Sequence, residues 1–173
     1  MPRYDQTQAE CLVFTFKEGL LSKIAHDLKV SVTRFSIDLS PSSVRAEFDA
    51  SSLRVVTAMK DGKENPDALS DGDKAKIGDQ IAKEVLHADQ HPSVVFTSRS
   101  VTPRADGGYN IVGELSLHGV TQPLQAETQV EANRQVVSLE LHQPDYGITP
   151  FKAMMGTLKV KAEVIVRLSV PAL

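Results

Sequence analysis

The stretch GELSLHGVTQPLQAETQV, residues 113–130, predicts a β-hairpin with one apolar face. Leu115 and Leu117 alternate with polar residues, and the turn at His118 and Gly119 leads into a second alternating run. Alternation with a period of two places successive side chains on opposite faces of a strand. One face of this hairpin is therefore buried. It forms either part of a packed core or the wall of a pocket that holds another molecule.

The same alternation runs through most of the chain and predicts about eight strands. Turn-forming residues at 106–108, 132–134 and 143–145 separate several of them. The apolar sets are Leu12, Phe14 and Phe16; Leu28, Val30 and Val32; Val44, Ala46 and Phe48; Val94 and Phe96; Ile111, Leu115 and Leu117; Leu124, Ala126, Thr128 and Val130; Val137, Leu139 and Leu141; and Leu158, Val160, Ala162, Val164, Val166 and Leu168. This pattern predicts an all-β fold, either an antiparallel sandwich or an up-and-down barrel.

One segment follows a helical period instead, and we expect a helix over about residues 73–87. Ser70 or Asp73 can cap its start, and Pro92 prevents the helix from continuing. Its apolar stripe consists of Ile77, Ile81, Val85 and Leu86. A second, shorter helical turn is possible within residues 18–27, before the second strand.

Composition limits the classes of function. The chain has 173 residues, which fits one domain spanning 1–173, and a net charge of −3. Lys and Arg are scattered along the sequence, so neither nucleic acid nor an anionic membrane surface is an expected partner. The single cysteine, Cys11, excludes an internal disulfide. Without a recognisable signal peptide or a membrane-spanning run, we expect a cytoplasmic protein.

Four stretches together resemble the YceI-like family: VRAEFDASSLRV (residues 44–55), KEVLHADQHPSVVFTS (83–98), GELSLHGVTQPLQAE (113–127) and DYGITPFKAMMGTLKVKAEVIVRL (145–168). They occur in the family's order and spacing, and the resemblance extends from about residue 10 to the end. It implies an eight-stranded lipocalin-like antiparallel β-barrel with the helix over one end. It also implies that the barrel binds an isoprenoid or another long-chain lipid.

The expected interior supports a cavity rather than a solid core. Eight strands enclose a space that side chains can fill or that can hold one slender ligand. The chain has six Phe, three Tyr and no Trp, and the inward positions are mostly Val, Leu, Ile and Ala. A barrel lined by side chains of this size leaves a void unless a ligand occupies it. We expect the ligand to contact Phe14, Phe16, His26, Leu28, Val30, Val32, Phe48, Phe96, Leu115, Leu117, Leu139, Phe151, Met154 and Met155.

The segment around Phe151, Met154 and Met155 combines flexible apolar side chains with flanking Pro and Gly residues. Methionine adapts to irregular partners. Two interpretations stand equal: a mouth that conforms to a lipid chain, or a contact that covers the barrel end or forms a homodimer. The candidates for orienting a polar head group are His26, Lys60 and Lys152.

Catalytic and metal motifs are weak, and we expect no enzyme, cofactor or metal site. His87 and His91 are four apart, but Pro92 follows directly and no Glu lies between them as in a zinc protease. His118 is interpreted as a turn residue that bonds its own backbone. His26 and Asp27 are neighbours that point to opposite faces of a strand. The alternative function is a cytoplasmic protein-interaction or regulatory module with a fully packed barrel.

Overall fold

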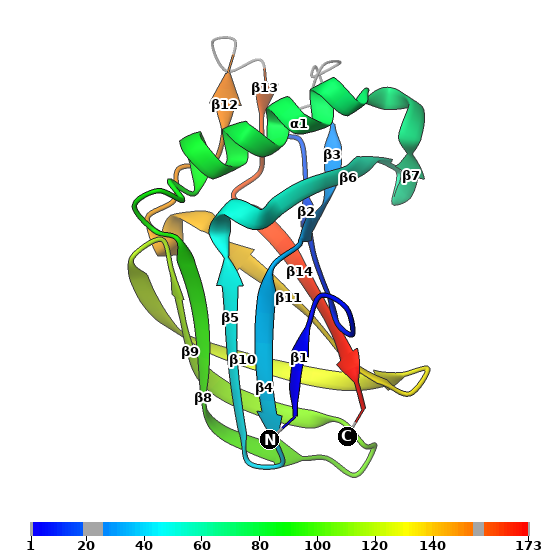
Figure 1. The fold of residues 1–173 in the computed structure, drawn as a ribbon, viewed down its shortest axis with the longest axis vertical. Coiled ribbons are helices and arrows are strands. Elements are labelled where there is room, and N and C mark those ends of the chain that lie inside the picture. The colour runs from blue at the N-terminus through cyan, green and yellow to red at the C-terminus, as the bar shows by residue number, and fades with distance from the viewer. Residues whose placement is uncertain (1, 19–25, 154–157, 173) are drawn as a thin grey trace.

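The computed structural model describes residues 2–18, 26–153 and 158–172, which form a curled antiparallel sheet with one α-helix (Figure 1). The strands are β1 (Arg3–Asp5), β2 (Glu10–Thr15), β3 (Asp27–Val32), β4 (Phe35–Ser40), β5 (Ser43–Asp49), β6 (Leu53–Lys60), β7 (Lys63–Asn65), β8 (Ser93–Pro103), β9 (Tyr109–Leu117), β10 (Val120–Glu131), β11 (Arg134–His142), β12 (Lys152–Ala153), β13 (Leu158–Lys159) and β14 (Glu163–Pro171). The helical segments are α1 (Asp71–Gln80), the π-helical turn η3 (Ile81–Val85), and the 3₁₀ turns η1 (Ala50–Ser52), η2 (Pro66–Ala68) and η4 (Gln143–Tyr146). The predicted all-β class with one helix is confirmed.

Twelve strands pair in the order β1-β4-β5-β8-β9-β10-β11-β14-β2-β3-β6-β7. Only two residues separate β3 from β4, and only η1 separates β5 from β6. The β3–β6 and β4–β5 ladders therefore join the same two chain segments across a bend. When each bent segment is counted as one strand, the paired strands close into a ring of eight: β2, β3/β4, β5/β6, β8, β9, β10, β11 and β14. Short strands β1 and β7 extend the sheet, and β12 and β13 form a separate hairpin.

The bend depends on Ser52, which is fully buried. Its carbonyl oxygen accepts hydrogen bonds from the Thr33 amide (3.0 Å) and the Thr33 hydroxyl (2.7 Å). Its hydroxyl accepts from the Arg34 amide (3.0 Å) and donates to the Asp49 carbonyl (2.8 Å). These bonds supply hydrogen-bond partners for backbone groups where both segments turn. The run 49–53, part of the family resemblance, thus has a structural role.

Helix α1 lies across one end of the barrel (Figure 1). Both residues predicted as caps take part, because the Ser70 hydroxyl accepts from the Asp73 amide (3.0 Å) and the Asp73 carboxylate accepts from the Ser70 amide (3.0 Å). The helix begins two residues before the predicted start and passes into η3, which ends at Val85. Most of the possible turn at residues 18–27 lies outside the described residues.

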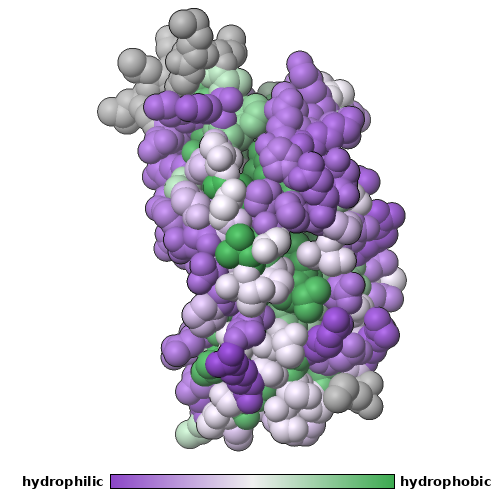
Figure 2. All heavy atoms as spheres, turned by 90° about the vertical axis from the view of Figure 1, so that its left-hand side faces the viewer, coloured by the Kyte–Doolittle hydropathy of each residue, from purple (hydrophilic) through white to green (hydrophobic). Residues whose placement is uncertain are grey.

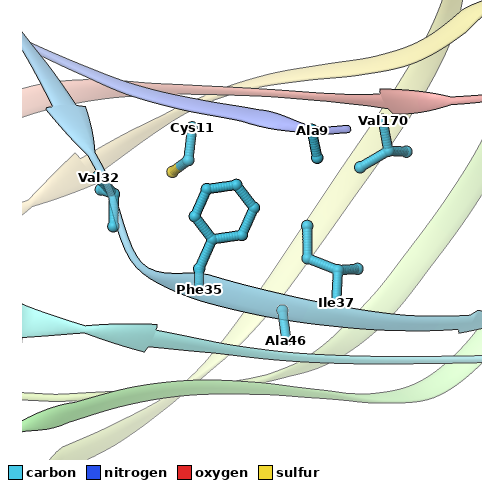
Figure 3. Packing of buried hydrophobic residues seen from close by; sticks show 7 residues of the cluster. All are labelled: Ala9, Cys11, Val32, Phe35, Ile37, Ala46 and Val170. Carbon is cyan, nitrogen blue, oxygen red and sulfur yellow. The ribbon is translucent and has the colours of Figure 1, made fainter. Parts of the chain in front are cut away.

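A cluster of buried hydrophobic residues lies where β4 and β5 approach β2, on the side of the bend away from α1 (Figures 1 and 3). We call this region the packed end and define it by four residues of the cluster: Ala9, Phe35, Ile37 and Val170. The other three residues of the cluster, Cys11, Val32 and Ala46, also border the cavity described below. Phe35 and Ile37 project from β4 toward Cys11 and Ala9, and Ala46 lies beside Ile37 on the neighbouring strand β5 (Figure 3). Large side chains facing small ones fill the space between strands to the density expected of a protein interior.

Candidate functional site: an apolar cavity in the barrel

The barrel toward α1 contains a cavity of about 900 Å³. We call this region the hollow end. Ligand pockets in proteins typically measure about 300 to 1,000 Å³, so this cavity is at the upper part of that range. Its wall consists of inward-facing strand residues, the underside of α1 and η3, and the β12–β13 hairpin. In Figure 2, hydrophobic side chains are visible beside the hydrophilic surface of α1, which lies at the upper right.

Strand alternation produces the wall directly. On β3 the wall residues are Leu28, Val30 and Val32, while Lys29 and Ser31 between them point outward. Ile77 of α1 and Ile81 of η3 pack against the cluster that contains Leu28 and Val30 of β3. We call α1 and η3 together the cap. The helix therefore uses its apolar stripe to roof the cavity.

Ten of the fourteen residues expected to contact a ligand lie in the cavity wall: His26, Leu28, Val30, Val32, Phe48, Phe96, Leu115, Leu117, Leu139 and Phe151. Met154 and Met155 lie outside the described residues. Phe14 and Phe16 are absent from the wall, so their predicted inward orientation is wrong. The structure therefore brings most, but not all, of the predicted residues together around one space.

The error on β2 is a shift of one residue. Cys11, Val13 and Thr15 line the cavity, and Phe14 pairs on the outer face with Ile165 and Lys29. A shift of one residue moves every side chain of a strand to the other face. Both faces of β2 are apolar, so alternation alone favoured the bulkier set. The interior takes the smaller set.

Several wall residues were placed in predicted strands or in the predicted helix but were not named as ligand contacts. On the strands they include Ile111, Val137, Val166 and Leu168, and on the cap they include Ile77, Ile81 and Leu86. Ile111 and Val137 share the alternation phase of named neighbours on β9 and β11, and Val166 and Leu168 share one phase in the predicted last strand. The same signal could therefore have identified them.

Polar side chains in the wall gather beneath the cap. His26, Asp73, Lys76 and Gln80 all contribute to the lining there. Hydrogen bonds from Ser70 lower the pKa of the Asp73 carboxyl, and the nearby charges of Lys76 and His26 lower it further. Of the three head-group candidates, only His26 lies in the wall, because Lys60 and Lys152 are exposed outside it. This end of the cavity can therefore offer hydrogen bonds to a polar head.

Three histidines meet outside the cavity, where the segment after η3 contacts the β9–β10 turn. The ring centroid of His118 lies 4.6 Å from that of His91 and 5.5 Å from that of His87. His118 Nδ1 is 3.2 Å from the Tyr146 carbonyl oxygen, so the predicted bond to its own backbone is wrong. Its Nε2 is buried without a hydrogen-bond partner among the described residues. Burial has the largest influence on the pKa of His118 and lowers it. The bond to the Tyr146 carbonyl raises this pKa, and the imidazoles of His91 and His87 lower it, so the net shift is downward.

Cys11 is buried, and burial raises the pKa of its thiol to about 12, which disfavours the nucleophilic thiolate. In the described part of the chain, no group of three or more His, Cys, Asp or Glu residues is arranged to hold a metal ion. Among the helices that the structure describes, none has the length and apolar character needed to cross a membrane.

The model of the YceI-like domain family matches residues 5–172. The chain belongs to the YceI-like family. The UPF0312 protein YE1254 of Yersinia enterocolitica is 41% identical over 49 residues, a match that covers 28% of this chain and 25% of that protein. The chain thus aligns with only a quarter of that relative's length.

Two solved structures share the fold of this YceI-like chain. Burkholderia cenocepacia BcnA superimposes with a TM-score of 0.66 at 16% identity, covering 95% of this chain and 96% of that one. A polyisoprenoid binding domain from Saccharophagus degradans, implicated in plant cell wall breakdown, superimposes with a TM-score of 0.62 at 13% identity. That match covers 99% of this chain and 97% of the other.

Proposed function

We propose that this YceI-like protein binds a long-chain apolar ligand inside its barrel without catalysis, for storage, transfer or a stress response. The ligand class is an isoprenoid, a quinone tail or a fatty amide. The observation that carries the proposal is the apolar cavity of about 900 Å³ at the hollow end. The name of the Saccharophagus domain supports the isoprenoid class.

Burial of the chain supplies the affinity. Each methylene transferred from water into an apolar lining contributes roughly 0.8 kcal/mol, so a long chain needs few polar contacts. The polar groups near His26 and Gln80 are positioned to orient a head group. A packed interaction module, the alternative function, would not need a cavity of this size. A cytoplasmic location and a homodimer stay predictions, testable by fractionation and by sedimentation.

Uptake of the apolar fluorophore N-phenyl-1-naphthylamine tests the proposal, together with mass spectrometry of organic extracts from the purified protein. We expect the wild type to take up the probe and Leu139→Glu to lose uptake while staying folded. Leu139 lies in the wall, whereas Ser138, its neighbour on β11, is exposed and outside it. Ser138→Glu is therefore the matched control and should bind normally. A wild type that takes up no probe and yields no lipid would contradict the proposal.

A further inference from the structure

A second, smaller space lies within the barrel beside the packed end. It measures about 80 Å³, and Ile37, which is 1% exposed, forms part of its lining. Four of its residues also line the main cavity: Val44, Ile111, Val137 and Leu168. They come from β5, β9, β11 and β14 respectively, so they surround the point where the two spaces meet. We call these four residues the aliphatic ring.

The smaller space suits hydrocarbon better than water, because the Thr128 and Gln135 side chains in its lining already bond to each other. The Thr128 hydroxyl donates to Gln135 Oε1 (2.6 Å) and accepts from the Tyr109 amide (2.9 Å). Gln135 Nε2 donates to the Gly107 carbonyl (2.9 Å). A buried water needs several free polar partners, and apolar cavities stay dry.

The two ends of the main cavity differ in polarity, and this orients a ligand. His26, Asp73, Lys76 and Gln80 contribute to the lining beneath the cap, whereas the aliphatic ring offers only methyl and methylene groups. A ligand with one polar end therefore enters with its hydrocarbon end toward the ring. Beyond the ring, Ile37, Leu39 and Val170 border the smaller space.

We infer that the aliphatic ring sets the longest hydrocarbon chain that the barrel accepts. This inference rests on the proposed function. A chain that reaches the ring fills the main cavity, and a longer chain must separate the ring side chains to enter the smaller space. Widening the ring joins the two spaces and admits longer chains. A bulkier side chain in the aliphatic ring shortens the longest hydrocarbon chain that the barrel accepts.

A homologous series of straight-chain primary amides, competing with the naphthylamine probe, tests the inference. For the wild type, each added methylene should tighten binding by roughly fourfold until the chain reaches the ring. Further methylenes should then add nothing or weaken binding. Val137→Ala should move this limit to a longer chain, and Val137→Phe should move it to a shorter one.

Val164→Ala is the matched control, since Val164 lies in the wall on β14, four residues before Leu168 and nearer the β12–β13 hairpin. It should weaken binding of all chain lengths without moving the limit. Circular dichroism checks that each variant folds, and Val137→Ala decides if Val137→Phe does not. An unmoved limit in the folded Val137 variants overturns the inference. No binding of any amide to the wild type instead overturns the proposed function.

Discussion

The packed end and the hollow end are built by the same strands yet differ in what occupies the middle. At the packed end, Phe35 and Ile37 from β4 fill the space opposite Cys11 and Ala9. At the hollow end, the described wall residues leave a cavity of about 900 Å³ between them. Apolar alternation therefore specifies a barrel, whereas one strand with bulky inward residues decides which part of it is solid.

The largest difference should follow a charge placed inside each end. Ile37→Glu buries a carboxylate at a position that is 1% exposed and borders only the smaller apolar space, and we expect the protein to fail to fold. Leu139→Glu places the same group beside a space that can admit water, and the fold should survive. Soluble yield and circular dichroism measure the difference. Equal loss of folding in both variants would contradict the distinction between the ends.

Replacing a phenylalanine by alanine should change the free energy of unfolding by different amounts at the two ends, and this difference should be smaller. Phe35→Ala removes a buried side chain and leaves a void, so we expect it to lower the free energy of unfolding by about 3 to 5 kcal/mol. Phe151→Ala removes a side chain that already borders the cavity, and we expect less than about 2 kcal/mol because it gives up fewer contacts. Urea denaturation gives both values. A larger loss for Phe151→Ala would show that the hairpin, rather than the packed end, stabilises the barrel.

The hollow end should also carry a dependence of stability on pH. The pKa of His118 is lowered from its ordinary value of 6.5, mainly by burial, so the unfolded chain binds the proton more readily. Stability from this group is full above pH 6.5 and falls as the pH drops toward the folded-state pKa. The carboxylates in the segments that meet here are Glu84, Asp89 and Asp145, and Asp145 Oδ1 lies 3.1 Å from His142 Nδ1.

Melting temperatures between pH 8 and pH 5 measure this effect. We expect a loss below that of Phe35→Ala, and a shallower dependence in His118→Asn. His142→Asn, at an exposed position, serves as the matched control. An unchanged slope in His118→Asn would assign the pH dependence to other groups.

The smallest effect concerns Cys11, at the boundary between the two ends. With a thiol pKa of about 12, only about one molecule in ten thousand carries the thiolate at pH 8. We expect alkylation by iodoacetamide to be slow in the folded protein and to become fast in urea. Fast alkylation of the folded protein would mean that the boundary opens readily to solvent.

Much of this fold could be predicted, because alternation, turn residues and helix caps act locally. The hairpin at 113–130, the helix cap at Ser70 and the wall on β3 follow from these signals. The phase of β2 could not be predicted from β2 itself. Leu12 on its outer face is only 7% exposed, so both faces exclude water and the pattern is ambiguous.

Contacts between segments that are far apart in the chain also could not be predicted from the sequence. His118 bonds to the backbone of a residue 28 positions away, and the aliphatic ring unites four strands. Neither arrangement has a local signature, since each depends on how the sheet curls. The cavity could be expected from the small inward-facing side chains. Its division into a larger and a smaller space could not, because that depends on how the sheet curls.

The pairing of β2 with β14 has a consequence for how the protein forms. This ladder joins Glu10 to Ser169 and Phe14 to Ile165, so closing the ring requires nearly the whole chain. Contacts between residues so distant in sequence are slow to form, and all-β domains of this kind typically fold in milliseconds to seconds. During synthesis, the inner faces of the earlier strands stay open to water until β14 has left the ribosome. The cavity is therefore among the last features to be completed, and the unfinished barrel is the form most exposed to aggregation.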